Sequence, residues 1–106
     1  QFTRAPYVTL ARLQVEGAAG AVIARLDDVS EGGLRARVEV EITVGTSVVL
    51  LFALPITGET WSAHCVVRWA VVHGPHHVLG LAFEDLDPQT RQVLVRYVTV
   101  MSAFGP

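Results

Sequence analysis

The sequence predicts a mainly β protein: a six-stranded antiparallel β-barrel with one C-terminal α-helix. Three observations support this class. The 106 residues suffice for one domain with one core, and six short apolar or alternating segments are separated by clusters of turn formers. The apolar spacing becomes helical only after Asp87. We expect residues 1–106 to form a single domain, and the lack of a start methionine at Gln1 indicates a piece excised or trimmed from a longer chain.

The first two strands are expected at residues 7–15 and 21–26. The first segment partly alternates between two sets of side chains, and the β-branched pair Val22 and Ile23 favours extended structure in the second. Residues 17–20 (GAAG) supply a turn between them. The two strands are therefore predicted to pair as a hairpin.

The third strand is expected to follow a long turn. Residues 27–33 (DDVSEGG) are a dense cluster of turn formers. Apolar and charged residues then alternate through residues 34–39. This pattern predicts a strand that carries Arg35 and Arg37 on one side.

Three more strands complete the predicted barrel. Residues 47–54 (SVVLLFAL) form a short, β-branched apolar run that is typical of a buried strand and is ended by Pro55. Residues 61–72 predict a long strand, which a turn at residues 73–77 (HGPHH) closes. Residues 78–83 (VLGLAF) are expected to pair back against it.

The last segment predicts a helix over residues 87–102. Asp87 is a good N-cap, and Pro88 fits the first helical turn. Apolar residues then recur at helical spacing, at Leu94, Tyr97, Val98 and Met101. Further valines widen the apolar surface beyond what one packing face needs, which predicts contact with another chain through this helix, as in a homodimer.

Composition excludes several function classes. Hydrophobic residues make up 51% and charged residues 17%, against roughly 25% charged in an average soluble protein, so the chain is expected to fold. Eight arginines, no lysine and a net charge of −2 argue against broad binding of DNA or RNA, but permit local recognition of an anion. The single cysteine favours a reducing cytoplasm, and no apolar run is long enough for membrane insertion.

The strongest candidate site is the segment from Asp28 through Ser30 to Gly33. A carboxylate and a hydroxyl two residues apart on an extended segment project to the same side and can bind one polar ligand. Gly32 and Gly33 allow the backbone to approach that ligand closely. Arginines upstream and downstream could supply donors to a phosphate or a guanine edge. The alternative is a turn whose Asp and Ser bind their own backbone.

The D-x-S-x-x-G pattern of this segment resembles the signature of PilZ domains. Later segments also resemble that family in order and spacing: the buried run before Pro55, Val66-Val67-Arg68-Trp69, Gly80-Leu81-Ala82-Phe83 and the closing helix. The resemblance implies a six-stranded barrel that binds the bacterial second messenger cyclic di-GMP without catalysis and without a further cofactor.

The resemblance also implies roles for single residues. Asp28 and Ser30 would contact a guanine edge, while Gly32 and Gly33 keep the turn tight. A second family signature, R-x-x-x-R, lies upstream of the barrel. Arg4 takes the place of its second arginine, and the first would lie one residue before Gln1. Arg4 would bind phosphate or stack on a guanine.

Other polar residues offer weaker candidates. Alternation adds Arg35 and Arg37 as helpers, with a solvated strand face as the alternative. The histidines at the turn in residues 73–77 lack the further ligands of a metal site, so no metal is expected. Cys65 is expected in the core. Two tryptophans eight residues apart on one strand, Trp61 and Trp69, are expected to pack on the same face.

Two functions follow from this sequence. The first is a cytoplasmic receptor in which cyclic di-GMP orders the segment around Arg4 against the barrel, and the reshaped surface meets a protein partner. The alternative is a degenerate adaptor that binds its partner without the nucleotide. No pair of residues has the spacing for general acid and base chemistry, so an enzyme is not expected.

Overall fold

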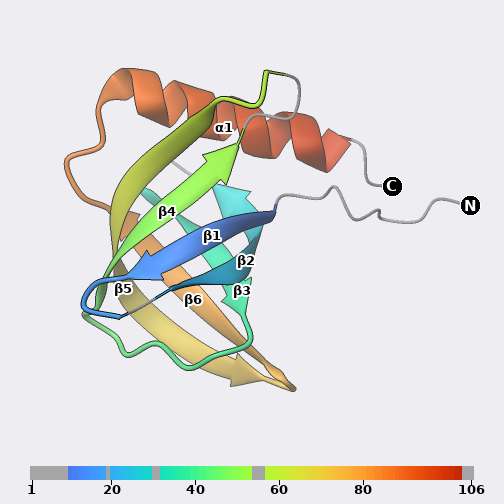
Figure 1. The fold of residues 1–106 in the computed structure, drawn as a ribbon. Helices are drawn as coiled ribbons and strands as arrows, with labels where there is room; N and C mark the ends of the chain where they lie inside the picture. The colour runs from blue at the N-terminus through green and yellow to red at the C-terminus, as the bar shows by residue number, and fades with distance from the viewer. Residues whose placement is uncertain (1–9, 19, 30–31, 54–56, 104–106) are drawn as a thin grey trace, which may run out of the picture.

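The computed structural model describes residues 10–18, 20–29, 32–53 and 57–103. They form a closed barrel of six antiparallel strands and one helix, which confirms the predicted fold class (Figure 1). The strand order is β1-β2-β3-β6-β5-β4, and β1 pairs with β4 to close the barrel. The elements are β1 (Leu10–Val15), β2 (Ala21–Val29), β3 (Gly33–Val38), β4 (Ser47–Ala53), β5 (Thr60–His73), β6 (His76–Phe83) and α1 (Pro88–Ala103).

The core fills the barrel with one set of alternating side chains from each strand. In β4, Val48, Leu50 and Phe52 are buried, and the residues between them are half-buried, as expected for this apolar run. Cys65 of β5 is also in the core, as predicted. Burial, together with the nearby charge of Glu84, raises the pKa of its thiol to about 12.

Strand β2 is longer than the sequence predicts. The turn-forming residues Asp27 and Asp28 belong to the strand, because pairing with β3 overrides their turn propensity. The register shifts between Leu26 and Asp28, which makes Asp27 the extra residue of a β-bulge. The predicted turn at residues 27–33 is therefore shorter than expected, since β3 begins at Gly33.

The turn between β5 and β6 is also tighter than predicted. His73 pairs with His76, so only Gly74 and Pro75 connect the strands. Gly74 has φ of 65°, which suits the first central position of a two-residue hairpin turn. For β1, the part of the predicted strand before Leu10 lies outside the described residues.

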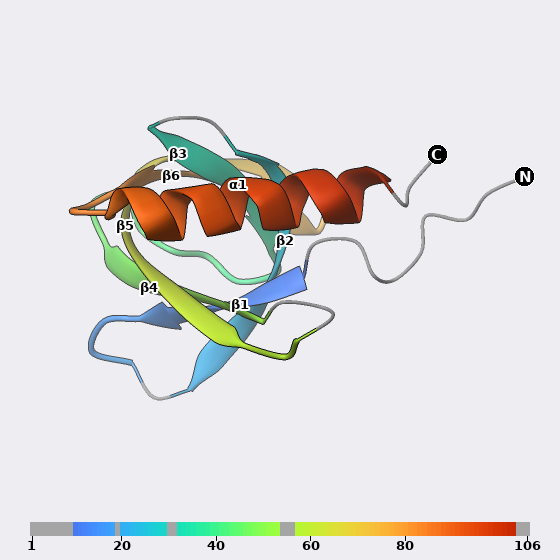
Figure 2. The ribbon, with the colours of Figure 1, turned by 90° about the horizontal axis from the view of Figure 1, so that it is seen from above.

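Helix α1 lies across one end of the barrel (Figure 2). The Oδ1 atom of Asp87 accepts a hydrogen bond from the backbone N–H of Thr90 at 3.3 Å, which confirms the predicted N-cap. Leu94 and Tyr97 are buried, and the Tyr97 ring lies 5.1 Å from that of Phe52 between centroids. No helix in the described part of the chain is long and apolar enough to cross a membrane.

The outward face of α1 is mostly polar where its side chains are described. Its exposed residues between positions 88 and 99 are Pro88, Gln89, Gln92, Val95, Arg96 and Thr99. Of these, Val95 is the large apolar residue, and it is 37% exposed. A homodimer through this helix stays a prediction.

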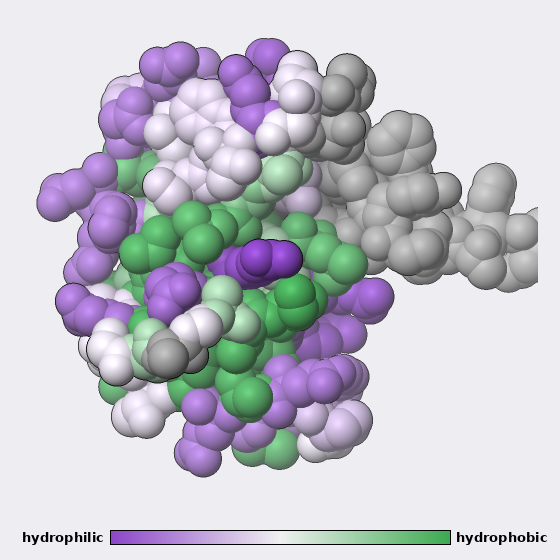
Figure 3. All heavy atoms as spheres, in the orientation of Figure 1, coloured by the Kyte–Doolittle hydropathy of each residue, from purple (hydrophilic) through white to green (hydrophobic). Residues whose placement is uncertain are grey.

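A larger apolar surface lies on the face formed by β1, β2 and β4 (Figure 3). Leu10 is 45% exposed and Ile23 is 60% exposed. Together with Arg12 and Leu51 they border an open depression of about 370 Å³. Exposed apolar patches of this kind often contact other molecules.

Candidate functional site

A second β-bulge places Trp69 on the outside of the barrel. In the first part of β5, alternate residues up to Val67 face the core. The register with β6 then shifts between Val67 and Trp69, so Arg68 is the extra residue. Arg68 and Trp69 are both exposed, whereas Trp61 is half-buried against the core. The prediction that the two tryptophans share a packing face is therefore wrong.

The two bulges align residues from four neighbouring strands in one row. Asp28 of β2 pairs with Arg35 of β3. Gly80 of β6 pairs with Arg35 on one side and with Trp69 on the other. Because neighbouring strands are about 4.8 Å apart, the row spans about 14 Å. The first residue of the D-x-S-x-x-G motif thus lies in register with an exposed indole.

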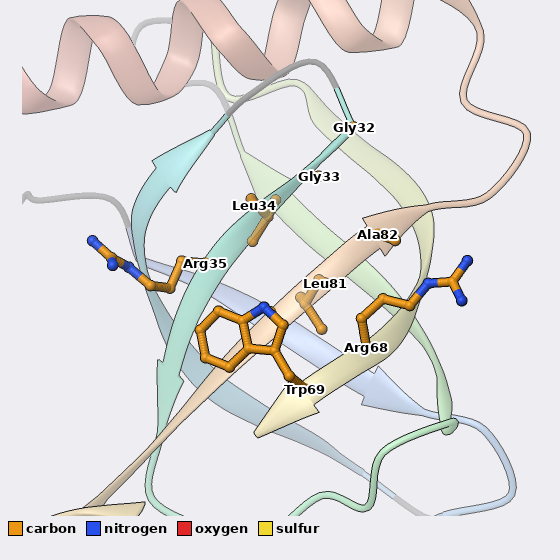
Figure 4. Close-up of a pocket in the computed structure, with 9 residues that line it drawn as sticks. Gly32, Gly33, Leu34, Arg35, Arg68, Trp69, Leu81 and Ala82 are labelled. Carbon is orange, nitrogen blue, oxygen red and sulfur yellow. The ribbon is translucent and has the colours of Figure 1, made fainter. Parts of the chain in front are cut away.

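An open pocket of about 310 Å³ lies over this row. In Figure 4 the indole of Trp69 lies between the side chains of Arg35 and Arg68, whose guanidinium groups extend away from the ring in opposite directions. The pocket is lined by Gly32, Gly33, Leu34, Arg35, Arg68, Trp69, Gly80, Leu81 and Ala82. This site therefore combines an aromatic face with two cations beside the motif glycines.

Gly80 makes room for the indole. A Cβ built on Gly80 would lie closer than 3.0 Å to three atoms of the Trp69 ring, Nε1 among them. The ring thus rests directly on the backbone of β6. A side chain at this position would have to displace it.

The two motif glycines have different surroundings. A Cβ on Gly33 would collide with the backbone carbonyl oxygen of Leu81, so close pairing of β3 with β6 requires glycine there. A Cβ on Gly32 would meet nothing within 4 Å. The carbonyl of Gly32 accepts a hydrogen bond of 3.0 Å from the N–H of Phe83, which anchors the loop to β6. Gly33 is thus required by packing, and Gly32 lines open space.

The structure places three of the predicted site residues at the pocket, namely Gly32, Gly33 and Arg35. The backbone of Asp28 lies next to it in register. Arg4 and Ser30 lie outside the described residues, so their predicted roles stay predictions.

Arg37 is engaged elsewhere. Its Nη2 atom donates to Oδ2 of Asp27 at 3.0 Å, in an ion pair across the bulge of β2. Among the side chains that the structure describes, which do not include that of Asp28, no carboxylate lies within 4.0 Å of the Arg35 or Arg68 guanidinium group. A described carboxylate therefore partly neutralises the positive charge of Arg37, whereas no described carboxylate does so for Arg35 or Arg68.

Helix α1 is hydrogen-bonded to β1, the strand that follows the segment of residues 1–9, which contains Arg4. The Tyr97 hydroxyl donates a hydrogen bond of 2.8 Å to the carbonyl oxygen of Leu10. Burial raises the pKa of Tyr97 above its usual value, so the hydroxyl keeps its proton to a higher pH than that of an exposed tyrosine. Leu10 is the first described residue after that segment, so α1 fixes the point at which the segment joins the barrel.

Comparison with known proteins agrees with this architecture. Residues 1–99 match the PilZ domain family. The chain belongs to this family. PilZ domains are a family of cyclic di-GMP receptors, and they act as binding modules.

One solved structure with a similar fold is that of the Bacillus subtilis inhibitor of motility (MotI/DgrA). The TM-score is 0.67 at 16% sequence identity, and the match covers 91% of this chain. It covers 48% of that structure, so this PilZ domain spans about half its length. No curated protein matches the sequence.

Sequence reasoning missed two residues of the pocket, Arg68 and Trp69. Uninterrupted alternation along β5 would have kept Trp69 on the inner face, and the bulge reverses this. The available signal was Arg68, a charged residue within the apolar run Val66-Val67-Arg68-Trp69. Alternation alone did not reveal the bulge, because its position depends on the pairing with β6.

Proposed function

We propose that this PilZ domain is a cytoplasmic receptor that binds cyclic di-GMP in the pocket over β3, β6 and β5. One observation carries the proposal: an exposed indole lies beside the glycines of the D-x-S-x-x-G motif, and the guanidinium group on either side of it forms no ion pair with a described side chain. Cyclic di-GMP has two guanine bases and two phosphates, which match an aromatic face and arginine forks. The function is binding and requires no further cofactor.

The proposed contacts divide between base and phosphate. A guanine stacks on the exposed face of Trp69, and Arg35 and Arg68 donate to phosphate oxygens. The carboxylate of Asp28 accepts from guanine N–H groups, and the Ser30 hydroxyl adds a further polar contact. Each charge-assisted hydrogen bond contributes about 1.5–3 kcal/mol.

Arg4 would transmit the binding event. When it binds phosphate or stacks on a guanine, the segment before Leu10 becomes ordered against the barrel. The Tyr97 hydrogen bond holds the base of that segment in place. The ordered segment then forms a new surface for a protein partner beside the apolar face of β1, β2 and β4.

Calorimetric titration of the chain, extended upstream of Gln1, with cyclic di-GMP tests the proposal. We expect saturable heat, and an affinity that falls at least tenfold, about 1.4 kcal/mol, in the Trp69→Ala and Arg4→Ala variants. The absence of heat would refute the receptor function and leave the nucleotide-independent adaptor. Unchanged affinity in Trp69→Ala would show that the nucleotide binds elsewhere.

A further inference from the structure

Strand β5 extends beyond its partner on one side. Its pairing with β4 ends where Ser47 pairs with Val66. Two further hydrogen bonds join Val67 to the turn that precedes β4. The N–H of Gly45 donates to the Val67 carbonyl at 2.7 Å, and the N–H of Val67 donates to the Thr46 carbonyl at 3.0 Å. Gly45 has φ of 95°, a left-handed conformation that glycine adopts without steric cost. Within the described residues, β5 beyond Val67 thus has β6 as its strand partner.

The free edge of β5 is exposed and apolar. All residues from Arg68 to His73 are exposed. The exposed fraction is 45% for Trp69, 53% for Val71 and 72% for Val72. Soluble proteins usually protect such edges with lysine, proline or charged side chains. No such residue lies between Trp69 and His73.

The hairpin geometry determines which backbone groups point to this edge. His73 and His76 flank a two-residue turn, so they form a hydrogen-bonded pair. Hydrogen-bonded and non-hydrogen-bonded pairs alternate along antiparallel strands, so Val71 also bonds to β6. The N–H and C=O groups of Ala70 and Val72 therefore point away from β6, toward the free edge.

We propose that two copies of this chain pair through the free edges of β5, in an antiparallel arrangement with twofold symmetry. In the matching register, Ala70 of one copy is opposite Val72 of the other. Each such pair exchanges two hydrogen bonds, and the twofold axis repeats them, which gives four bonds. Val71 of one copy is opposite Val71 of the other, on the twofold axis. Trp69 of each copy is opposite His73 of the other.

Charge and symmetry support a second copy as the occupant of this edge. Arg68 lies outside the paired residues, so this register places no two arginines opposite each other. A twofold interface is self-complementary and involves only two copies, so the free β5 edges of both copies are paired. The inference does not depend on nucleotide binding, because the Trp69 ring rests on Gly80, on the side of β5 away from the free edge.

Intermolecular disulfide formation tests the register. Residues in a non-hydrogen-bonded antiparallel pair have Cα atoms about 4.5 Å apart, within the range of about 4.4–6.8 Å that a disulfide spans. Under mild oxidation, the Val71→Cys variant should therefore form a covalent dimer in high yield. Native Cys65 should not interfere, because it is buried.

Two matched variants serve as controls. Ile23→Cys introduces an exposed cysteine on β2, where Ile23 is 60% exposed. Val95→Cys introduces one on α1. Both should form little covalent dimer under the same oxidation, because neither position lies at the proposed β5 interface. Equal cross-linking of Ile23→Cys would refute the register, and preferential cross-linking of Val95→Cys would support the helix interface in its place.

Sedimentation equilibrium tests the association itself, at about 10 μM to 1 mM protein. We expect the unmodified chain to show a monomer–dimer equilibrium, and the Val71→Lys variant to weaken it at least tenfold because two ammonium groups would meet on the axis. Ile23→Lys should leave the equilibrium unchanged. A chain that stays monomeric throughout this range, or a Val71→Lys variant that dimerises normally, would refute the proposal.

Discussion

The indole of Trp69 rests on the backbone of Gly80, at a distance that excludes any side chain at position 80. This contact spans two neighbouring strands, and it exists because the bulge at Arg68 brings Trp69 into register with Gly80 on the outer face. The absence of a side chain at Gly80 thus leaves room for the ring against the backbone of β6. The pocket geometry therefore depends on Gly80 as well as on the residues that would touch a ligand.

Substitution of Gly80 by alanine should weaken binding of cyclic di-GMP by displacing the indole. We expect at least a tenfold loss of affinity by calorimetry, together with a destabilisation of about 1–3 kcal/mol from overpacking, measured by urea unfolding. In a Trp69→Ala background the same substitution should cost much less stability, because the clashing ring is absent. Additive effects in this double-mutant cycle would contradict the contact.

The two motif glycines should respond differently to alanine. Gly33→Ala brings a Cβ against the Leu81 carbonyl and should destabilise the fold by about 1–3 kcal/mol. Gly32→Ala meets open space and should change stability by no more than about 0.5 kcal/mol. Urea unfolding of both variants gives the comparison, and equal destabilisation would show that Gly32 is also constrained.

Arg35 and Arg37 should separate into a binding and a structural residue. Arg35→Ala removes a cation from the pocket and should weaken nucleotide binding at least tenfold. Arg37→Ala breaks the ion pair with Asp27 and should lower stability by about 1 kcal/mol or less, because the pair is partly exposed. Calorimetric titration and thermal unfolding of each variant measure the two effects. A larger affinity loss in Arg37→Ala would reverse this assignment.

Stability should fall in alkaline solution because of Cys65. Its pKa is about 12 in the folded protein against an ordinary value of 9.0, so the unfolded chain loses this proton first as the pH rises. The contribution of this pKa difference to the free energy of unfolding is fully present below pH 9.0. It is lost as the pH rises toward 12, by at most about 1.4 kcal/mol per pH unit. Urea unfolding across this range should show a smaller slope in Cys65→Ala. An identical slope would show that other groups are responsible.

The hydrogen bond from Tyr97 should stabilise the junction of α1 with β1. Tyr97→Phe removes the hydroxyl and leaves the Leu10 carbonyl without this donor, which should cost about 1–3 kcal/mol. The ring still packs on Phe52, so the helix should remain in place. Thermal unfolding measures the loss, and circular dichroism checks the retained helix. Unchanged stability would mean that water replaces the bond.

The barrel and the helix could be predicted from local patterns. Alternation and β-branched runs located the strands, and Asp87 with Pro88 located the start of α1. Predictions failed where residues distant in the sequence compete with local preference. Asp27 and Asp28 have turn propensity, but pairing with β3 keeps them in β2.

By itself, the sequence determined the fold class, the family and the motif from Asp28 to Gly33, because all three depend on residue type and spacing. Only the tertiary structure decided which side chains share the pocket. Each bulge shifts the register by one residue, and a one-residue shift reverses the face on which a side chain lies. That shift brings Trp69 outward to the motif glycines, and it results from the pairing of β5 with β6, which alternation along β5 alone does not reveal.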